Sequence, residues 1–174
     1  MSSSESTTDA PQGVPALSHL DEKGRAGMVD VATKPDSVRT ASARALIRIS
    51  AEADRLLLSG ALKKGPPLEV VRVASIQGAK AAAQLIPLCH PVRLSQIEAQ
   101  VARGGESVWS VIVTVKAVDR TGVEMEAMTG AAIGALTFYD MIKAVDRSAV
   151  IETVVLLHKS GGRSGPWQRE PDPR

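Results

Sequence analysis

Alternating apolar and polar positions mark two strands in the middle of the chain. Over residues 107–118, one alternating set is Trp109, Val111, Val113 and Val115, and the other is Val108, Ser110, Ile112 and Thr114. Because successive side chains of a strand point to opposite faces, this pattern predicts a strand with one apolar face. Residues 94–101 predict a second strand, and Arg103-Gly104-Gly105-Glu106 between the two predicts a hairpin turn.

The same period predicts a strand near each end of the chain. Over residues 44–49, Ala45, Ile47 and Ile49 alternate with a set that contains two arginines. This pattern indicates a strand with one partly polar face. Residues 150–157 predict the last strand, with Ile151, Val155 and Leu157 on one side.

Longer periods predict helices between these strands. Residues 51–60 form a short amphipathic segment that ends at Gly60, a suitable C-cap. Residues 68–85 predict a helix that ends before Pro87, and residues 123–144 predict a second long helix. The positions expected to be buried in the first long helix are Val70, Val71, Ala74, Ala81 and Leu85.

The predicted order is strand, helix or helices, strand, strand, helix, strand. This is the split β-α-β order of ferredoxin-like α+β folds, in which helices cover one face of an antiparallel sheet. The other face is then either polar or covered by another subunit. We expect a disordered tail at residues 1–16, one domain at residues 17–167, and a C-terminal tail at residues 168–174.

Composition narrows the function classes. Hydrophobic residues make up 44% of the chain but aromatics only 2%, and the formal net charge is +2. No dense Lys/Arg block is interleaved with aromatics, so nucleic acid is not an expected partner. No apolar run approaches the roughly 20 residues of a membrane span, and the N-terminus lacks signal-peptide features. Cys89 is the single cysteine, which fits a reducing compartment, so we expect a cytoplasmic protein.

The second long helix carries candidate acid–base residues. Asp140 and Lys143 are three apart, so they share a helix face, and a carboxylate beside a lysine can orient it and tune its pKa. Glu124 and Glu126 are two apart and would share a side in an extended segment. The competing interpretation is a solvated charged face, in which such a pair contributes about 0–1 kcal/mol.

Three other segments carry candidate chemistry. His90, between Cys89 and Pro91, is either a proton carrier on a stiff loop or a structural histidine. Lys64 precedes Gly65 at a predicted bend and is either a reaching side chain or a solvated one. The segment from Lys159 to Arg163 surrounds a Gly-Gly pair and is either an anion-binding nest or a mobile basic tail.

Several familiar motifs are missing from the sequence. Cys89 and His90 have no CxxC or HxxxH partner, so we expect no protein-held metal. The chain contains no P-loop, no dinucleotide-binding fingerprint and no GxSxG elbow. Residue types alone therefore indicate an α+β protein with an acid–base site and cations for an anionic ligand.

Six segments in order make the chain resemble the cyclic pyranopterin monophosphate synthases of molybdenum cofactor biosynthesis. The segments are residues 28–31 (MVDV), 64–65 (KG), 85–91 (LIPLCHP), 121–127 (TGVEMEA), 135–145 (ALTFYDMIKAV) and 159–165 (KSGGRSG). The chain departs from the family's usual pattern at Gly27, Pro66, Gly130 and Gly134.

This resemblance implies a substrate, a product and a set of site residues. The substrate is 3',8-cyclo-7,8-dihydroguanosine 5'-triphosphate, and the products are cyclic pyranopterin monophosphate and diphosphate. The catalytic residues it implies are Asp140, Lys64 and Lys143. The substrate-binding residues it implies are Leu88, Cys89, His90, Met125 and Glu126. It implies no cofactor, although Mg²⁺ can accompany the triphosphate, and it implies a homo-hexamer built as a trimer of dimers with sites shared between subunits.

A non-catalytic protein is the alternative. A ferredoxin-like oligomer that senses nucleotides would also use the basic loop, the Gly-rich segment and an uncovered sheet face. It would need binding cations but not a paired Asp140 and Lys143. Turnover of the cyclic triphosphate separates the two hypotheses.

Overall fold

The computed structural model of the protein describes residues 23–62 and 66–170. The expected N-terminal tail at 1–16, Lys64 and the last four residues lie outside this part. The elements are β1 (Ser37–Arg48), α1 (Ala51–Ser59), α2 (Pro67–Lys80), α3 (Ala82–Leu85), β2 (Leu94–Gly105), β3 (Val108–Asp119), α4 (Glu124–Ile142), β4 (Val150–Ser160) and β5 (Trp167–Gln168).

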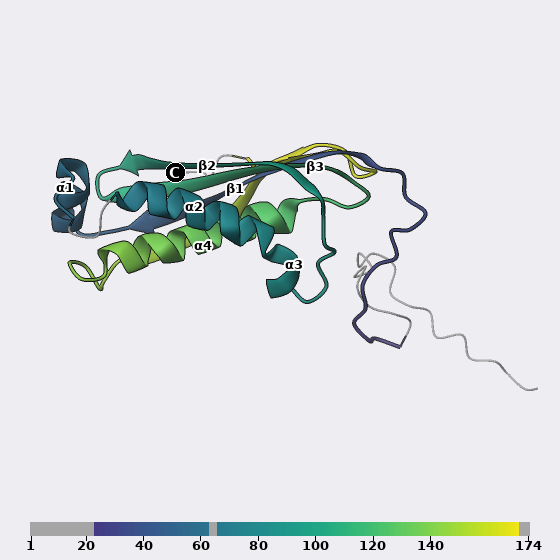
Figure 1. Cartoon of the computed structure of the whole chain (residues 1–174), viewed down its shortest axis with the longest axis horizontal. Helices are drawn as coiled ribbons and strands as arrows, with labels where there is room; N and C mark the ends of the chain where they lie inside the picture. The colour runs from purple at the N-terminus through teal and green to yellow at the C-terminus, as the bar shows by residue number, and fades with distance from the viewer. Residues whose placement is uncertain (1–22, 63–65, 171–174) are drawn as a thin grey trace, which may run out of the picture.

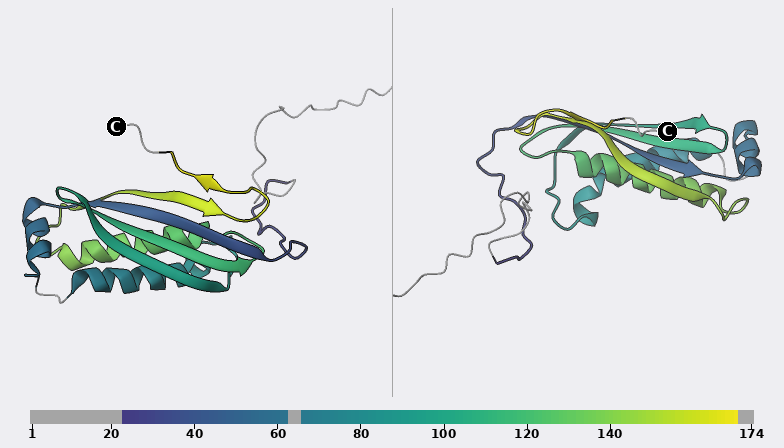
Figure 2. Two further views of the ribbon diagram at one scale, coloured as in Figure 1. Left: turned by 90° about the horizontal axis from the view of Figure 1, so that it is seen from above. Right: turned by 180° about the vertical axis from the view of Figure 1, so that it is seen from behind.

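The strands form one antiparallel sheet in the order β2-β3-β1-β4-β5. Helices α2 and α4 lie side by side against one face of it, and α1 stands at one end (Figure 1). The view from above shows the strands in this order with the helices behind them (Figure 2). The predicted α+β fold with helices on one face is confirmed, and β5 adds a short edge strand that the sequence pattern did not predict.

Small and β-branched residues fill the core between the sheet and the two long helices. Ala41, Ala43, Ala45 and Ile47 of β1 are fully buried, as are Val111, Val113 and Val115 of β3. The predicted alternation in β1 and β3 is therefore confirmed. Two of the few aromatics, Trp109 and Phe138, pack in a tilted arrangement at a ring-centroid distance of 5.7 Å.

Glycines allow α2 and α4 to approach each other closely. A Cβ atom at Gly130 would lie 2.9 Å from the carbonyl oxygen of Ser75, and one at Gly134 would lie 2.2 Å from its hydroxyl oxygen. On the other helix, a Cβ at Gly78 would lie 2.7 Å from the Cβ of Ile133. A side chain at Gly130 or Gly134 would therefore force a shift in this helix contact.

The predicted buried face of the first long helix is partly wrong. The helix ends at Lys80 and Ala81 caps it, so residues 82–85 form the separate α3. Val70 and Leu85 are exposed. Val71 is buried as predicted, and Ser75, Gly78 and Ala79 are the other buried residues of α2. These three residues are small because the close contact with α4 leaves no room for larger ones.

The predicted hairpin turn is also displaced along the chain. Strand β2 continues to Gly105 and β3 begins at Val108, so the turn is Glu106-Ser107, with Ser107 at φ 55°. Arg103 belongs to β2, where its guanidinium contacts the carboxylate of Asp54. The Gly-Gly pair resembled a turn by composition, but pairing with β3 extends through it.

Two bulges change which side chains of β4 face the core. Ile151 pairs with Ile47, whereas the next pair is Thr153 with Leu46, so the register shifts by one residue. As a result Ile151, Val154 and Leu156 pack against the core. The prediction that Val155 and Leu157 share a side with Ile151 is wrong, because uniform alternation does not anticipate an inserted residue.

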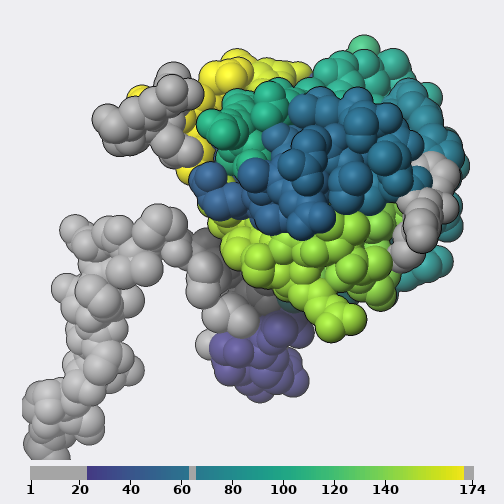
Figure 3. Space-filling view, turned by 90° about the vertical axis from the view of Figure 1, so that its left-hand side faces the viewer, coloured from purple at the N-terminus to yellow at the C-terminus, as the bar shows by residue number. Residues whose placement is uncertain are grey.

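A buried carboxylate fixes α1 to the end of the sheet. Asp54 is 4% exposed and accepts hydrogen bonds from the Arg103 guanidinium, the Trp109 indole N–H (2.9 Å) and the Ser107 backbone N–H (3.3 Å). The hydrogen bond from Arg103 is the main cause of its lowered pKa. The space-filling view of this end shows α1, in blue, covering it above the green atoms of α4 (Figure 3).

Candidate active site

Helix α4 carries candidate site residues at both of its ends. Met125 and Glu126 lie in its first turn, whereas Asp140 lies in its last turn and Lys143 caps it. Asp140 follows Glu126 by 14 positions. At a rise of about 1.5 Å per residue, the two carboxylates lie about 21 Å apart along the helix axis. One chain therefore holds two separate groups of candidate residues.

The first group, here called the amino-end cluster, consists of Leu88, Cys89, Met125 and Glu126. The thiol of Cys89 contacts Glu126 Oε1 at 3.6 Å, and a turn closed by the Cys89 N–H and the Ile86 carbonyl (3.1 Å) brings the cysteine there. A cavity of about 360 Å³ is lined by Ile86, Pro87, Leu88, Cys89 and Met125. The candidate substrate-binding residues of two segments that are far apart in the sequence thus lie together.

His90 follows the amino-end cluster in the chain and is half-buried. Its carbonyl oxygen is 3.6 Å from the Cys89 thiol. The loop therefore places His90 beside the cluster.

Burial controls the protonation of the amino-end cluster. Glu126 is 3% exposed, and its Oε2 atom is buried without a hydrogen-bond partner among the described residues. Burial is the main cause that raises the pKa of this carboxyl. Burial, followed by the nearby Glu126 charge, raises the pKa of the Cys89 thiol to about 11. At neutral pH Cys89 is therefore a neutral donor rather than a thiolate nucleophile.

The second group, here called the carboxyl-end pair, is Asp140 with Lys143. Lys143 Nζ lies 2.6 Å from Asp140 Oδ1, and both side chains are about half exposed. The hydrogen bond from Lys143 to Asp140 raises the pKa of the lysine. The predicted sharing of a helix face is confirmed, and the lysine is held in its protonated form.

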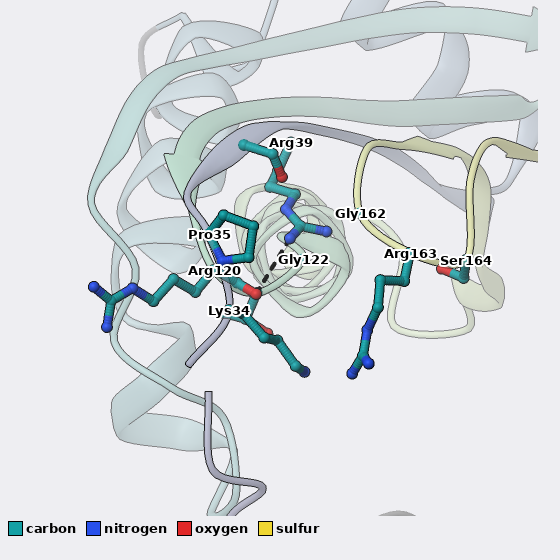
Figure 4. Close-up of a pocket in the computed structure, with 10 residues that line it drawn as sticks. Lys34, Pro35, Arg39, Arg120, Gly122, Gly162, Arg163 and Ser164 are labelled. Atoms are coloured by element: carbon teal, nitrogen blue, oxygen red, sulfur yellow. Dashed lines mark hydrogen bonds between the residues drawn. The ribbon is translucent and has the colours of Figure 1, made fainter. Parts of the chain in front are cut away.

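A basic pocket lies near the start of α4. Its cavity of about 510 Å³ is lined by Lys34, Pro35, Ser37, Arg39, Arg120, Thr121, Gly122, Gly162, Arg163 and Ser164. Figure 4 shows Lys34 and Arg163 extending from opposite sides of this space. Among the described residues, the lining contains four cations and no carboxylate. This composition suits a multiply charged anion.

Arg39 is fixed on one side of the basic pocket. Its Nε donates to the carbonyl oxygen of Asp119 and its Nη2 to the carbonyl oxygen of Arg120, both at 3.2 Å. Arg39 comes from β1 and the two carbonyls from the end of β3. Since guanidinium groups present a planar fork of donors, a fixed arginine is suited to phosphate oxygens.

The N-terminal segment is attached to this pocket through Arg120. The Arg120 guanidinium donates to the Ala32 carbonyl (3.1 Å) and to Asp36 Oδ1 (3.3 Å). Asp36 also pairs with Arg93 at 3.6 Å. These contacts place the segment that carries Lys34 against the ends of β2 and β3.

Lys159 connects the basic pocket with the start of α4. Its Nζ donates to the Ser164 hydroxyl at 2.5 Å and lies 3.7 Å from Glu124 Oε1. The second bulge in β4 pairs Lys159 with Ala41, whose side chain faces the helices, so Lys159 reaches the same side. Glu124 therefore has a defined cationic partner.

Sequence analysis did not single out Lys34, Arg39 or Arg120. Arg39 fits the polar set of a strand, and no spacing links these residues to one another. Arg163 was a candidate anion ligand, and the structure places it in the basic pocket.

Neither a metal centre nor a membrane span is found in the part of the chain that the structure describes. In residues 23–62 and 66–170, no three His, Cys, Asp or Glu side chains are grouped closely enough to hold a metal ion. None of the helices in these ranges has the length and apolar character needed to cross a bilayer.

The sequence model of the MoaC family matches residues 28–162, a range that includes both groups on α4 and most of the basic pocket. The chain belongs to the MoaC family. It is 50% identical over 157 residues to a cyclic pyranopterin monophosphate synthase of Thermomicrobium roseum, covering 90% of this chain and 95% of that protein. The predicted family is thereby confirmed.

Two further relatives are similar to this chain over most of their length. The chain is 47% identical over 153 residues to cyclic pyranopterin monophosphate synthase 2 of Mycobacterium tuberculosis H37Rv, covering 88% of this chain and 91% of that protein. It is 48% identical over 154 residues to a cyclic pyranopterin monophosphate synthase of Campylobacter jejuni subsp. doylei, covering 88% of this chain and 98% of that protein. The matched regions thus cover most of this chain rather than one motif.

Proposed function

We propose that this MoaC-family chain is a cyclic pyranopterin monophosphate synthase that acts on 3',8-cyclo-7,8-dihydroguanosine 5'-triphosphate. The observation that carries the proposal is the basic pocket beside the amino-end cluster at one end of α4. The pocket offers cations to a triphosphate, and the cluster offers a buried carboxyl and an apolar wall to a fused ring system. The family relationship supplies the identity of the substrate.

The basic pocket binds the triphosphate. Lys34, Arg39, Arg120 and Arg163 converge on it from separate segments of the chain. Because diphosphate leaves in this reaction, negative charge develops on its oxygens. Cations that are already in place stabilise this charge without further rearrangement.

The amino-end cluster binds the purine-derived part of the substrate. Leu88 and Met125 line its apolar cavity, and the Cys89 thiol is a neutral donor beside Glu126. Glu126 Oε2 is buried and has no hydrogen-bond partner in the described part of the protein, and a ring N–H of the substrate would supply one. His90 completes the substrate-binding set that the resemblance implies.

Asp140, Lys143 and Lys64 perform the acid–base steps. The Asp140 carboxylate keeps Lys143 protonated, which suits a proton donor or a partner for developing negative charge. Lys64 lies outside the described residues and is assigned on the family resemblance alone. Ring opening and closure of the cyclic phosphate require several proton transfers, for which two lysines and a carboxylate are suitable groups.

The active site is completed by a second subunit. About 21 Å of helix separates the carboxyl-end pair from the amino-end cluster of the same chain, which favours a site that takes the two groups from different subunits. The sheet face away from the helices carries Leu46, Ile112 and Leu157, which line an open cavity of about 560 Å³. These features support sites at subunit interfaces, and the homo-hexamer, arranged as a trimer of dimers, rests on the family resemblance.

Turnover of the cyclic triphosphate tests the proposal. Purified protein should release diphosphate and form cyclic pyranopterin monophosphate, both measured by chromatography. Lys143→Ala and Asp140→Asn should each lower kcat at least ~10²-fold, as expected for loss of a general acid–base group. Arg55→Ala, which removes an exposed cation on α1, should leave kcat unchanged.

Two outcomes would contradict these roles. Full turnover by Lys143→Ala or Asp140→Asn would exclude the carboxyl-end pair from catalysis. Binding of the cyclic triphosphate without any product would instead favour a non-catalytic nucleotide-sensing oligomer.

A further inference from the structure

The loop after β4 lies directly against the guanidinium of Arg39. Gly162 has φ +79°, and a Cβ atom built there would be 1.7 Å from Arg39 Nη1 and 2.8 Å from Arg39 Cζ. Figure 4 shows Gly162 beside this guanidinium at the edge of the basic pocket. Any side chain at position 162 therefore overlaps with the arginine as it now lies.

The arginine has little freedom to move away from such a side chain. On the side of β3, its Nε and Nη2 donate to the carbonyl oxygens of Asp119 and Arg120. A guanidinium has five N–H donors, so three remain for a ligand after these two bonds. Displacement by a side chain at position 162 would break the two bonds that orient the others.

The loop after β4 is also held in place, on its side that faces β1. A Cβ atom at Gly161 would lie 2.1 Å from the carbonyl oxygen of Val38, so the loop backbone rests on the start of β1. Lys159 also connects to the loop through the Ser164 hydroxyl. The loop thus cannot withdraw from Arg39 without losing its contact with β1.

We propose that Gly162 is a positioning residue, and that the absence of a side chain at this position sets the orientation of the Arg39 guanidinium for binding phosphate oxygens. In this role the glycine acts through the arginine rather than through a contact of its own with the ligand. The identity of the natural ligand rests on the proposed function, but the contact between Gly162 and Arg39 does not.

A competing explanation is that Gly162 is needed only for its backbone conformation. Positive φ values favour glycine whatever surrounds them. Gly165 provides the control, because it lies in the same loop, has φ +65°, and would place a Cβ atom in open space, with no described neighbour within 4 Å. Gly165→Ala therefore imposes a similar backbone strain without contact with Arg39.

The first experiment measures binding of inorganic triphosphate by titration calorimetry. Gly162→Ala should weaken binding at least about tenfold, the effect expected from losing one charge-assisted hydrogen bond. Gly165→Ala should bind within about twofold of the unaltered protein, since the added methyl group meets no described neighbour and leaves Arg39 in place. Equal affinities for the two alanine variants would overturn the proposal.

The second experiment removes the arginine. If Gly162 acts through Arg39, then Arg39→Ala with Gly162→Ala should bind triphosphate no more weakly than Arg39→Ala alone. The thermal unfolding midpoint should show the same coupling. Deleting Arg39 removes the overlap, so the double variant should recover part of the fall in midpoint that Gly162→Ala causes. A full additional loss of affinity, or no recovery of the midpoint, would overturn the proposal even if Gly162→Ala folds poorly.

Kinetics separate this inference from the proposed function. In an active enzyme, Gly162→Ala should raise KM for the cyclic triphosphate more than it lowers kcat. No turnover by the unaltered protein would refute the synthase assignment and leave the triphosphate comparison valid. Turnover with equal KM for Gly162→Ala and Gly165→Ala would refute the role of Gly162 and leave the synthase assignment intact.

Discussion

At the scale of single residues, the most unusual group is the buried carboxyl of Glu126. It is 3% exposed, one of its oxygens has no partner among the described residues, and its other neighbours include a thiol with a raised pKa. Burial favours the neutral form of the carboxyl, and the nearby charges of Glu124 and Asp119 act in the same direction. The folded protein therefore binds this proton more tightly than the unfolded chain does.

This shift predicts the pH dependence of a Glu126→Gln variant. A raised folded-state pKa gives stability that is fully present below the ordinary value of 4.5 and is lost as pH rises through the folded-state pKa. Glutamine keeps the shape and removes the charge. The variant should therefore unfold at a higher temperature than the unaltered protein, by a margin that grows from about pH 4 to about pH 8.

Thermal unfolding across this range measures the margin. Glu98→Gln, an exposed exchange on β2, should show no such growth with pH. A margin that is constant or that shrinks as pH rises would mean that Glu126 is ionised without penalty in the folded protein.

At the scale of elements, α1 is held to the sheet through one carboxylate. Asp54 accepts hydrogen bonds from β2 and β3 side chains and from the hairpin turn between them. Its lowered pKa means that this contribution is present above pH 3.8, the ordinary value, and is lost as pH falls through the folded-state pKa.

Asp54→Ala should therefore destabilise the protein at neutral pH. It leaves the buried indole N–H of Trp109 without an acceptor, which costs about 1–3 kcal/mol of unfolding free energy. Urea titration at about pH 7 and about pH 3 measures the loss, which should be smaller at the lower pH. Glu52→Ala, an exposed change on the same helix, should have little effect. A loss of equal size at both pH values would contradict the role of the charge.

Helices and strands were easier to predict from the sequence than the bulges that interrupt their regular pattern. The alternation around Trp109 and the apolar segment of α4 predicted β3 and α4 because each has an uninterrupted period. The bulges of β4 were not predictable, since an inserted residue leaves no mark in a run of β-branched side chains. Yet the second bulge is what directs Lys159 to Glu124.

Some candidate site residues could likewise be predicted from a local sequence pattern, and others could not. Asp140 and Lys143 were predictable as a pair because helical spacing places them on one face. The association of Cys89 with Glu126 was implied only by the family resemblance, because it depends on how α3 and its following turn pack against α4. The cations of the basic pocket come from segments far apart in sequence, and no local pattern relates them.

At the scale of the whole molecule, α4 separates two groups that the proposed chemistry needs together. The amino-end cluster and the basic pocket lie at its start, and the carboxyl-end pair lies at its end, about 21 Å away. The uncovered sheet face offers a surface for a second copy. This separation is the reason for proposing a site that two subunits complete.

Mixed oligomers test this central claim most directly. Chains with Glu126→Gln and chains with Lys143→Ala, each expected to be nearly inactive, are co-expressed with different affinity tags, and the mixed oligomers are isolated. If each site takes the amino-end cluster from one subunit and the carboxyl-end pair from another, random mixing at equal amounts restores about a quarter of the sites. The account predicts turnover near a quarter of that of the unaltered protein. Turnover that stays at the level of the separate variants would show that each chain forms its site alone and would contradict the account.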